Sequence, residues 1–218
     1  ELASVTKIMA TTLATMKLVE EGAIDLDEHV SAYLKDFREK GLTHIRIRNL
    51  LQHNAGFKSW IPFYRETFDS TGTELRKDLY SDQESNYYCY KLVDQLYICR
   101  DYQDSIWAKI IHSDVRTDEK VRYSDLSMMV MQMLIESVTQ KPLYQYLDSV
   151  FFAPMGMNHT AYNPQKKLAG VAYAPSEIDQ YWRKKKGEGY VHDQAAAMLG
   201  GVSGHAGLFA NSFDVAKA

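Results

Sequence analysis

Cysteine and proline are scarce in this sequence. Its 218 residues include two cysteines and five prolines. Two cysteines, Cys89 and Cys99, are too few for a disulfide framework or a cysteine-ligated metal site, although they could pair with each other if the fold brings them together. The apolar stretches also fall short of the roughly 20 residues that a membrane-spanning helix needs. The sequence therefore excludes a disulfide-stapled miniprotein and a transmembrane helix, and its composition is that of an ordinary globular protein.

A strong excess of charge is also lacking. The formal net charge is −3 and no basic face emerges, so we expect no nucleic-acid partner. One dense basic run, from Arg183 to Lys186, is followed closely by Gly187 and Gly189. A short basic run beside glycines is typical of a solvated loop. The sequence therefore predicts that the side chains of this run are exposed.

The N-terminus lacks two common features. The chain does not begin with methionine, and no charged start followed by an apolar core marks a signal peptide. It begins at Glu1, three residues before Ser4, which is the candidate nucleophile described below. We expect the sequence to be a piece of a longer protein.

Hydrophobic periodicity predicts a mainly helical fold with few short strands. Apolar residues recur at three- and four-residue spacing in several segments. Helices are predicted within 4–21, 25–34, 45–52, 124–139 and 142–150, and from 213 onward. The tyrosine-rich region shows no period of two, so helices are favoured over strands around 88–98 and 105–112. Beyond Phe152, prolines and glycines predict loops.

Ser4 and Lys7 are the first candidates for catalysis. A serine hydroxyl is a poor nucleophile and needs a base beside it. On a helix, residues three positions apart share a face, so the Lys7 amine can reach the Ser4 oxygen. Burial and the positive end of the helix favour a neutral, basic Lys7. Because 15 serines and 16 lysines yield about one Ser-x-x-Lys by chance, the spacing alone also fits a capping serine and an exposed lysine.

Tyr123 is the next candidate. Tyr123-Ser124-Asp125 stands at the start of the apolar helix predicted over 124–139. A tyrosine hydroxyl near an ammonium group can exchange protons with a serine or with a leaving group. The alternative is that the Tyr123 ring only packs at the beginning of that helix.

Two competing chemistries lack their motifs. Gly-x-Ser-x-Gly marks one class of serine hydrolase with a histidine-based triad, but residues 201–205 read GVSGH, with histidine in place of the second glycine. The seven histidines show no His-Glu-x-x-His spacing, so we predict no metal. His192 and Asp193 precede a run of small residues and could cap a helix, and we assign them no catalytic role.

Five segments together resemble one family. They are 4–7 (SVTK) at the start of a long helix, 50–56 (LLQHNAG), 123–126 (YSDL), 152–157 (FAPMGM) and 200–209 (GGVSGHAGLF). In this order they resemble the class C β-lactamase-like serine hydrolases, a family that includes DD-peptidases, penicillin-binding proteins and related esterases. The resemblance extends over nearly the whole chain, which makes it far more specific than any single motif.

The resemblance implies a helical domain beside an antiparallel sheet flanked by helices, with the site at their junction. It implies that Ser4 is the acylated nucleophile, that Lys7 is its activating partner and that Tyr123 is the base or proton shuttle. Asp125 stands where the family usually has asparagine. It is a candidate for substrate binding, but it could instead pair with Lys7 or serve structurally.

The glycine-rich segment lies near the substrate cleft in the family. His205 and Gly207 are therefore further candidates for substrate binding, with loop packing as the alternative for His205. His53, in the LLQHNAG segment, fits a histidine that stabilises a turn. The Ser4 backbone N–H is expected to help hold an oxyanion.

The third motif of the family is absent. Lys-Thr-Gly, or a histidine-containing equivalent, lies on a downstream edge strand in the family, and the sequence stops before such a strand. The strands that precede the nucleophile helix are also missing. We therefore expect residues 1–218 to form part of one serine hydrolase domain, to lack most of the sheet and to be catalytically impaired alone.

For function, the resemblance implies hydrolysis through an acyl-enzyme. The candidate substrates are a D-alanyl peptide of the cell-wall type, a β-lactam and a small ester. The alternative is a non-hydrolysing penicillin-binding or sensor module on the same fold. No cofactor is implied, the expected location is extracytoplasmic (periplasm or cell envelope), and the oligomeric state stays open.

Overall fold

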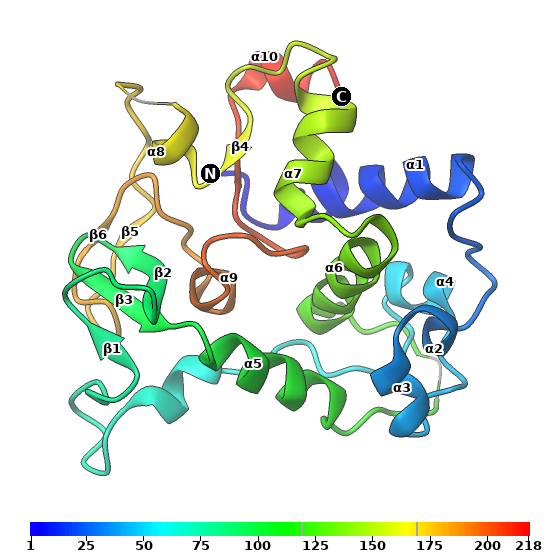
Figure 1. Cartoon of the computed structure of the whole chain (residues 1–218), viewed down its shortest axis with the longest axis horizontal. Coiled ribbons are helices and arrows are strands. Elements are labelled where there is room, and N and C mark those ends of the chain that lie inside the picture. Colours follow the sequence, from blue (N-terminus) through cyan, green and yellow to red (C-terminus); the bar gives the residue numbers. More distant parts are fainter. Residues whose placement is uncertain (119, 169) are drawn as a thin grey trace.

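The computed structural model describes residues 1–118, 120–168 and 170–218. A long helix, α6 (Asp125–Thr139), lies at the centre, with other helices around it (Figure 1). Ser124 caps α6, because its side chain accepts a hydrogen bond from the Ser127 N–H at 3.2 Å. Gln140 ends α6 in the left-handed conformation, at φ 53°. The helix predicted over 124–139 is confirmed.

The core surrounds α6. Nine of its 15 residues are buried, including polar Ser127 and Gln132, whereas a surface helix buries only one stripe. Its first residue, Asp125, is only partly buried, and its carboxylate contacts Lys7 Nζ at 2.7 Å. The same helix therefore contributes to the core and places the Asp125 carboxylate beside Lys7.

The segment that carries Ser4 is one continuous helical run with three geometries. A 3₁₀ turn (Ala3–Val5) leads into a π-helix (Lys7–Thr12), and α1 (Leu13–Glu20) follows. Gly22 ends the run at φ 69°, a conformation that suits glycine. The predicted helix is confirmed, and its wide π-helical part begins at Lys7. Such π-helical turns are frequent at functional sites.

Shorter helices cover the outside of the core. Those predicted within 25–34, 45–52, 105–112 and 142–150, and the one beginning near 213, are present. They are α2 (Val30–Tyr33), α3 (Lys35–Glu39), α4 (Ile47–Leu51), α5 (Tyr102–Ile111), α7 (Leu143–Leu147), α8 (Pro164–Lys167), α9 (Gln194–Met198) and α10 (Ser212–Val215), with a 3₁₀ helix at Phe63–Thr67 and a π-helix at Asp148–Phe152.

The region 88–98 forms a β-hairpin, so the prediction of a helix there is wrong. The sheet is antiparallel, in the order β1-β3-β2, with β1 (Tyr80–Ser81), β2 (Tyr88–Val93) and β3 (Leu96–Cys99). Asp94 and Gln95 form the two-residue turn, and Gln95 adopts φ 52°. Because most residues of β2 are half-buried on both faces, no alternation of polar and apolar residues marks this strand in the sequence.

Two further antiparallel strand pairs are short. They are β4 (Ala161–Tyr162) with β7 (Leu208–Phe209), and β5 (Glu177–Ile178) with β6 (Lys186–Gly187). β7 also holds the N-terminal segment, because Leu2 N–H donates to the Leu208 carbonyl at 2.9 Å and Leu208 N–H donates to Thr6 Oγ1 at 3.1 Å. The N-terminal segment is thus joined to β7 next to Ser4. β4 also lies near the N-terminus in Figure 1.

Arg183 is buried, so the prediction of an exposed basic loop is wrong at this residue. Its guanidinium contacts the carboxylates of Asp179 at 3.2 Å and Glu177 at 3.0 Å. It also donates to the backbone carbonyls of Val191 at 2.6 Å and His192 at 2.8 Å. The lysines of the same run are exposed or half-buried. A guanidinium can be buried when carboxylates and carbonyls accept from its N–H groups. The sequence of the basic run does not show whether such partners lie nearby.

The two cysteines lie on neighbouring strands without a bond between them. Cys89, on β2, is half-buried, and Cys99, on β3, is buried, and both are free thiols. The pairing that the sequence left open is thus absent from the structure. None of the helices in the described ranges has the length and apolar character that crossing a membrane requires.

Candidate active site

Lys7 is the centre of the site. Its Nζ donates to Ser4 Oγ at 3.0 Å and to the His205 backbone carbonyl at 3.1 Å, and it lies 2.7 Å from Asp125 Oδ1. An ammonium group has three N–H donors, and Lys7 has three acceptors around it. The Lys7 side chain is buried, whereas Ser4 is exposed. The exposed Ser4 hydroxyl thus contacts a buried Lys7 amine that has three acceptors around it.

The contact with Asp125 bears on the charge of Lys7. A carboxylate in direct contact with an amine favours the charged form of both groups. The expectation of a neutral Lys7, which rested on burial and on the positive end of the helix, did not include this contact. The contact matches the alternative in which Asp125 pairs with Lys7. Lys7 Nζ therefore contacts Asp125 and Ser4 Oγ at the same time.

Tyr123 contacts Lys7 through its ring. Lys7 Nζ lies 4.7 Å from the ring centroid, within the range of a cation–π interaction. The Tyr123 side chain is half-exposed, and among the described residues its hydroxyl has no hydrogen-bond partner. The structure thus brings Tyr123 beside Lys7, while its hydroxyl stays free.

His53 supports the segment that carries Tyr123. Its ring lies against the Tyr123 ring at 4.8 Å between centroids, and its Nδ1 accepts a hydrogen bond from the Ser124 N–H at 3.1 Å. Burial lowers the pKa of His53, and the positive charge of Lys7 lowers it further. A neutral imidazole is needed to accept from Ser124. The geometry agrees with the prediction that His53 stabilises a turn.

Backbone contacts hold Asp125 at the start of α6. Asp125 N–H donates to the Ser59 carbonyl at 2.8 Å, and Ser124 Oγ donates to the Lys58 carbonyl at 2.7 Å. The segment that follows His53 therefore fixes the direction in which α6 begins. This direction brings the Asp125 carboxylate to Lys7.

The glycine-rich loop is packed tightly between the nucleophile helix and α6. The Gly204 carbonyl accepts from Thr11 Oγ1 at 2.6 Å, and the Gly204 N–H donates to Gln132 Oε1 at 3.0 Å. A Cβ on Gly204 would lie 2.2 Å from the Met128 carbonyl oxygen. Gly207, which we predicted to bind substrate, is buried and turns the chain at φ 110°. Close backbone approach explains both glycines.

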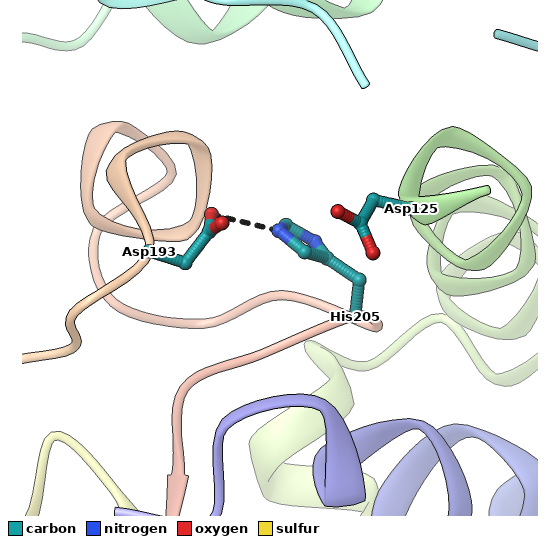
Figure 2. Close-up of side chains that lie close together, drawn as sticks. All are labelled: Asp125, Asp193 and His205. Atoms are coloured by element: carbon teal, nitrogen blue, oxygen red, sulfur yellow. Dashed lines mark hydrogen bonds and ion pairs between the residues drawn. The ribbon is translucent and has the colours of Figure 1, made fainter. Parts of the chain in front are cut away.

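His205 is buried, with partners on both ring nitrogens. Nε2 is 2.8 Å from Asp193 Oδ1, and Nδ1 is 2.7 Å from Ser203 Oγ. Figure 2 shows the Asp193–His205 bond, with Asp125 on the other side of the imidazole. Both ring nitrogens are engaged with Asp193 and Ser203. The predicted contact of His205 with a substrate can therefore involve only the carbon atoms of the ring.

Asp193 was missed as a site residue by sequence reasoning. It caps α9 as predicted, with Oδ1 accepting from the Ala196 N–H at 2.8 Å, and the same oxygen binds His205. Burial by itself raises the pKa of Asp193, but the charge and hydrogen bond of His205 and the Ala196 N–H outweigh it and lower the pKa to about 2. The capping pattern was the only local signal, and it does not reveal the histidine.

Ser203, His205 and Asp193 occur in the bonding order of a serine-histidine-aspartate triad. Ser203 is fully buried, however, and its hydroxyl points into the protein toward His205. A nucleophile must reach the carbonyl of a substrate within about 3.5 Å. The burial of Ser203 prevents this approach, so we do not assign it as a nucleophile.

A pocket opens on the other side of the carboxylates. The space that it encloses is about 20 Å³, and Asp125, Asp193 and His205 are among its lining residues. The opposite wall comes from the segment 60–64, in which Trp60 is exposed. Ser4 and Lys7 are not among the lining residues, although Lys7 contacts both Asp125 and His205. A space of this size holds about one water molecule.

One group of possible metal ligands is present at the site. One atom each of Asp125, Asp193 and His205 lies within 4.8 Å of the others. Lys7 already contacts Asp125, and the His205 nitrogen that faces Asp193 is engaged in their hydrogen bond. A cation here would have to compete with the ammonium group of Lys7. We therefore interpret the group as an ion cluster built around Lys7.

The sequence matches the Beta-lactamase family over residues 1–218. The chain belongs to the Beta-lactamase family. It is 34% identical to an N-acetylmuramyl-L-alanine amidase of Bacillus subtilis, with 99% of this chain and 48% of the relative aligned. It is 32% identical to a putative D-alanyl-D-alanine carboxypeptidase of Salmonella agona, with 99% of this chain and 49% of the relative aligned. The chain spans about half the length of these curated relatives.

Solved structures show the same fold. An octameric penicillin-binding protein homologue from Pyrococcus abyssi matches with a TM-score of 0.62 at 22% identity, covering 99% of this chain and 42% of that one. A β-lactamase/D-alanine carboxypeptidase from Yersinia pestis matches with a TM-score of 0.56 at 18% identity, covering 99% and 51%. The expected fold class, a mainly helical portion of the β-lactamase fold, is confirmed.

In this member of the Beta-lactamase family, we expect Asp193 to stabilise the fold in neutral and weakly acidic solution. Its folded pKa of about 2 lies below the ordinary 3.8, so the contribution is complete above about pH 4 and is lost as the pH falls through about 2. The contribution amounts to roughly 2 kcal/mol. Urea unfolding of the wild type and Asp193→Asn between about pH 6 and 2.5 measures it.

The difference in unfolding free energy between the two proteins should shrink as the solution is acidified. Asp82→Asn serves as the control, because Asp82 is exposed in the loop before β2. Its effect on stability should be small at every pH. A constant difference for Asp193→Asn down to about pH 2.5 would contradict the proposed ionisation of Asp193.

Proposed function

We propose that the protein is a serine hydrolase in which Ser4 forms an acyl-enzyme. One observation carries this proposal: exposed Ser4 Oγ lies 3.0 Å from Lys7 Nζ, which also contacts the Asp125 carboxylate at 2.7 Å. Nucleophile and base within hydrogen-bond reach, with the base oriented by a third group, is the arrangement that activates a serine. Membership of the Beta-lactamase family supports a serine hydrolase in general terms.

The three groups define a path for the proton. Ser4 Oγ attacks the carbonyl carbon of the substrate, and its proton moves to Lys7 as a proton of Lys7 moves to Asp125. The bond to the leaving group then breaks, and the leaving group takes a proton from the same path. Tyr123 lies against Lys7 with a free hydroxyl and is placed to pass this proton on. Water later attacks the ester, which releases the acid and restores Ser4.

In the transition state, negative charge develops on the carbonyl oxygen of the substrate, and hydrogen-bond donors must stabilise it. The Ser4 backbone N–H, at the beginning of the helical run, is the donor that this chain contributes in the proposal. The positive end of the helix acts in the same direction. The segment 200–209 lies beside it and is held by its bonds to Thr6 and Thr11.

The proposed substrate is an acyl compound of the cell-wall peptide type, with a β-lactam or a small ester as related acyl donors. The names of the relatives support this class, since one is an N-acetylmuramyl-L-alanine amidase and the other a putative D-alanyl-D-alanine carboxypeptidase. Both names denote cleavage of an amide bond. Such a substrate implies an extracytoplasmic location, which we include in the proposal.

The second candidate is a penicillin-binding or sensor module that is acylated without turnover. Asp125 leaves room for it, because the family usually has asparagine at this position, and a carboxylate here removes an amide donor. The free hydroxyl of Tyr123 also has no partner among the described residues that would direct it toward a water molecule. Acylation would then be possible while hydrolysis stays slow.

The mass of the intact protein after exposure to penicillin tests both candidates. The measurement uses this chain and the full-length protein, each beside Ser4→Ala. We expect an adduct on the full-length protein that Ser4→Ala lacks. Rapid decay of the adduct supports a hydrolase, and persistence for hours supports a sensor. Absence of an adduct on the folded full-length protein, with penicillin and with an activated ester, contradicts the assignment of Ser4.

A further inference from the structure

Buried His205 and partly exposed Asp193 form a pair beside Lys7, and the proposed reaction does not use either of them. The His205 ring bonds to Asp193 and Ser203, while the His205 carbonyl accepts from Lys7 Nζ. We propose that Asp193 and His205 are positioning residues that hold Lys7 in register with Ser4. This inference rests on the proposed role of Lys7 as the partner of Ser4.

The first step concerns the His205 carbonyl, which fixes the direction of one Lys7 N–H. The ring of the same residue is held at both ends, at 2.8 Å by Asp193 and at 2.7 Å by Ser203. A ring with both nitrogens engaged cannot rotate without losing two hydrogen bonds, of which the bond to Ser203 is buried, and a buried group left unpaired is costly. The side chain of His205 therefore locks the position of its own carbonyl.

The backbone on either side of His205 is also fixed. Tyr162 donates through its hydroxyl to the Ser203 carbonyl at 3.0 Å, and Gly204 is bound by Thr11 and Gln132. Leu208 is bound by Thr6. Thr6 and Thr11 flank Lys7 on the nucleophile helix. Hydrogen bonds therefore join the glycine-rich loop to the nucleophile helix on both sides of His205. The contact of Lys7 with the His205 carbonyl lies between them.

The second step concerns charge. Asp193 is ionised at neutral pH, because its pKa is lowered to about 2, and the positive charge of Lys7 contributes to this lowering. Asp125 contacts Lys7 directly, and Asp193 lies on the opposite side of the His205 imidazole from Asp125 (Figure 2). Asp193 therefore places a negative charge near Lys7.

Three further titratable groups, Glu1, His53 and Tyr123, lie near Lys7, His205 and Asp193. Glu1 lies at the N-terminus, where its carboxylate accepts from the His192 N–H at 2.9 Å. His53 and Tyr123 lie on the side of Ser4 and Lys7. Burial raises the pKa of Glu1, so Glu1 adds its own titration to any profile measured at low pH. The pH range for the test is therefore neutral to alkaline.

The test uses the full-length protein with ¹³C-labelled lysine. The Lys7 side-chain signal, assigned by its loss in Lys7→Met, is followed by NMR from about pH 6 to 12. The rate of Ser4 modification by a fluorophosphonate is measured in parallel. The variants are Asp193→Asn, which removes the charge, His205→Ala, which removes the clamp, and His205→Gln, which keeps an N–H donor for Asp193. His192→Ala, at the exposed neighbour of Asp193, is the control.

We expect the Lys7 titration midpoint to fall by at least about half a pH unit in Asp193→Asn, since a favourable charge is lost. We expect His205→Ala to slow Ser4 modification about tenfold or more, and His205→Gln to restore part of the rate. His192→Ala should change neither quantity. If His205→Ala does not fold, Asp193→Asn and His205→Gln still decide the outcome.

The two proposals fail in different ways. An unchanged Lys7 titration in folded Asp193→Asn and His205→Gln, together with an unchanged Ser4 rate, overturns the positioning role. A wild-type Ser4 that does not react, with a Lys7 midpoint that still depends on Asp193, overturns the nucleophile assignment and leaves the positioning of Lys7 supported.

Discussion

Replacing Lys7 with methionine is expected to slow the acylation of Ser4 by about a thousandfold or more. A positioned base contributes roughly 10² to 10⁴ to such a step, and Lys7 is the amine that contacts Ser4 Oγ. Methionine has a similar length but cannot accept or donate the proton. It also leaves the Asp125 carboxylate without its cation. The measurement is the second-order rate constant of adduct formation, obtained from intact mass.

Two further variants separate the roles of Lys7. Lys7→Arg keeps a positive charge beside Asp125, but a guanidinium does not release its proton. If Lys7 works as a base, the arginine variant should be nearly as slow as the methionine variant. Lys17→Met, on the same helical run, removes an exposed lysine that pairs with Glu20 and should leave the rate unchanged. A Lys7→Met rate within tenfold of the wild type would refute the assignment of Lys7.

Arg183→Met is expected to lower the free energy of unfolding by about 3 to 5 kcal/mol. Removing one partner of a buried ion pair leaves an uncompensated charge, and such losses have this size. Asp179, which Arg183 contacts, is buried, and burial by itself raises its pKa. Hydrogen bonds from Arg183 and from the Trp182 and Tyr181 N–H groups hold the pKa of Asp179 below its usual value. Methionine removes the charge that compensates this carboxylate.

Urea unfolding of Arg183→Met beside Lys184→Met measures the effect. Lys184 is the neighbouring residue and is mostly exposed, so its loss should cost less than about 1 kcal/mol. Arg183→Lys should not restore the wild-type value, because an ammonium group has three donors and Arg183 uses its guanidinium for Asp179, Glu177 and two carbonyls. A loss below about 1 kcal/mol for Arg183→Met would mean that the buried network contributes little.

Arg183 also links the stability of this region to the site. It holds the carbonyls of Val191 and His192, the residues directly before Asp193. We therefore expect a smaller, secondary effect of Arg183→Met on Ser4 reactivity, through the position of Asp193. This effect should resemble that of Asp193→Asn more than that of Lys7→Met.

The site was only partly predictable from the sequence. Ser4 and Lys7 are three residues apart on a helix, so local geometry predicts their contact, and the structure confirms the distance. Tyr123 and Asp125 were expected near them only because of a family resemblance. Asp193 had no such signal, since its acidic side chain looked like a helix cap, which it also is. Its bond to His205 depends on how two loops meet.

The same division holds for the fold. Periodicity predicted α6 and the nucleophile helix, because each buries apolar residues at a spacing that the helix itself imposes. It failed at β2 and β3, where half-buried aromatic residues hide the alternation of a strand. It also failed at Arg183, whose burial depends on carboxylates and carbonyls brought together by the loop.

The sequence by itself thus determined the helical segments, the pairing of Ser4 with Lys7 and the family to which the chain belongs. These depend on residues a few positions apart, or on the order of motifs. Only the tertiary structure decided that Lys7 contacts both Asp125 and the His205 carbonyl, and that Asp193 bonds to the His205 ring. The contact of Lys7 with the His205 carbonyl joins residues 198 positions apart. No local spacing encodes such a contact, because it forms only when packing of the core brings the nucleophile helix, α6 and the glycine-rich loop together.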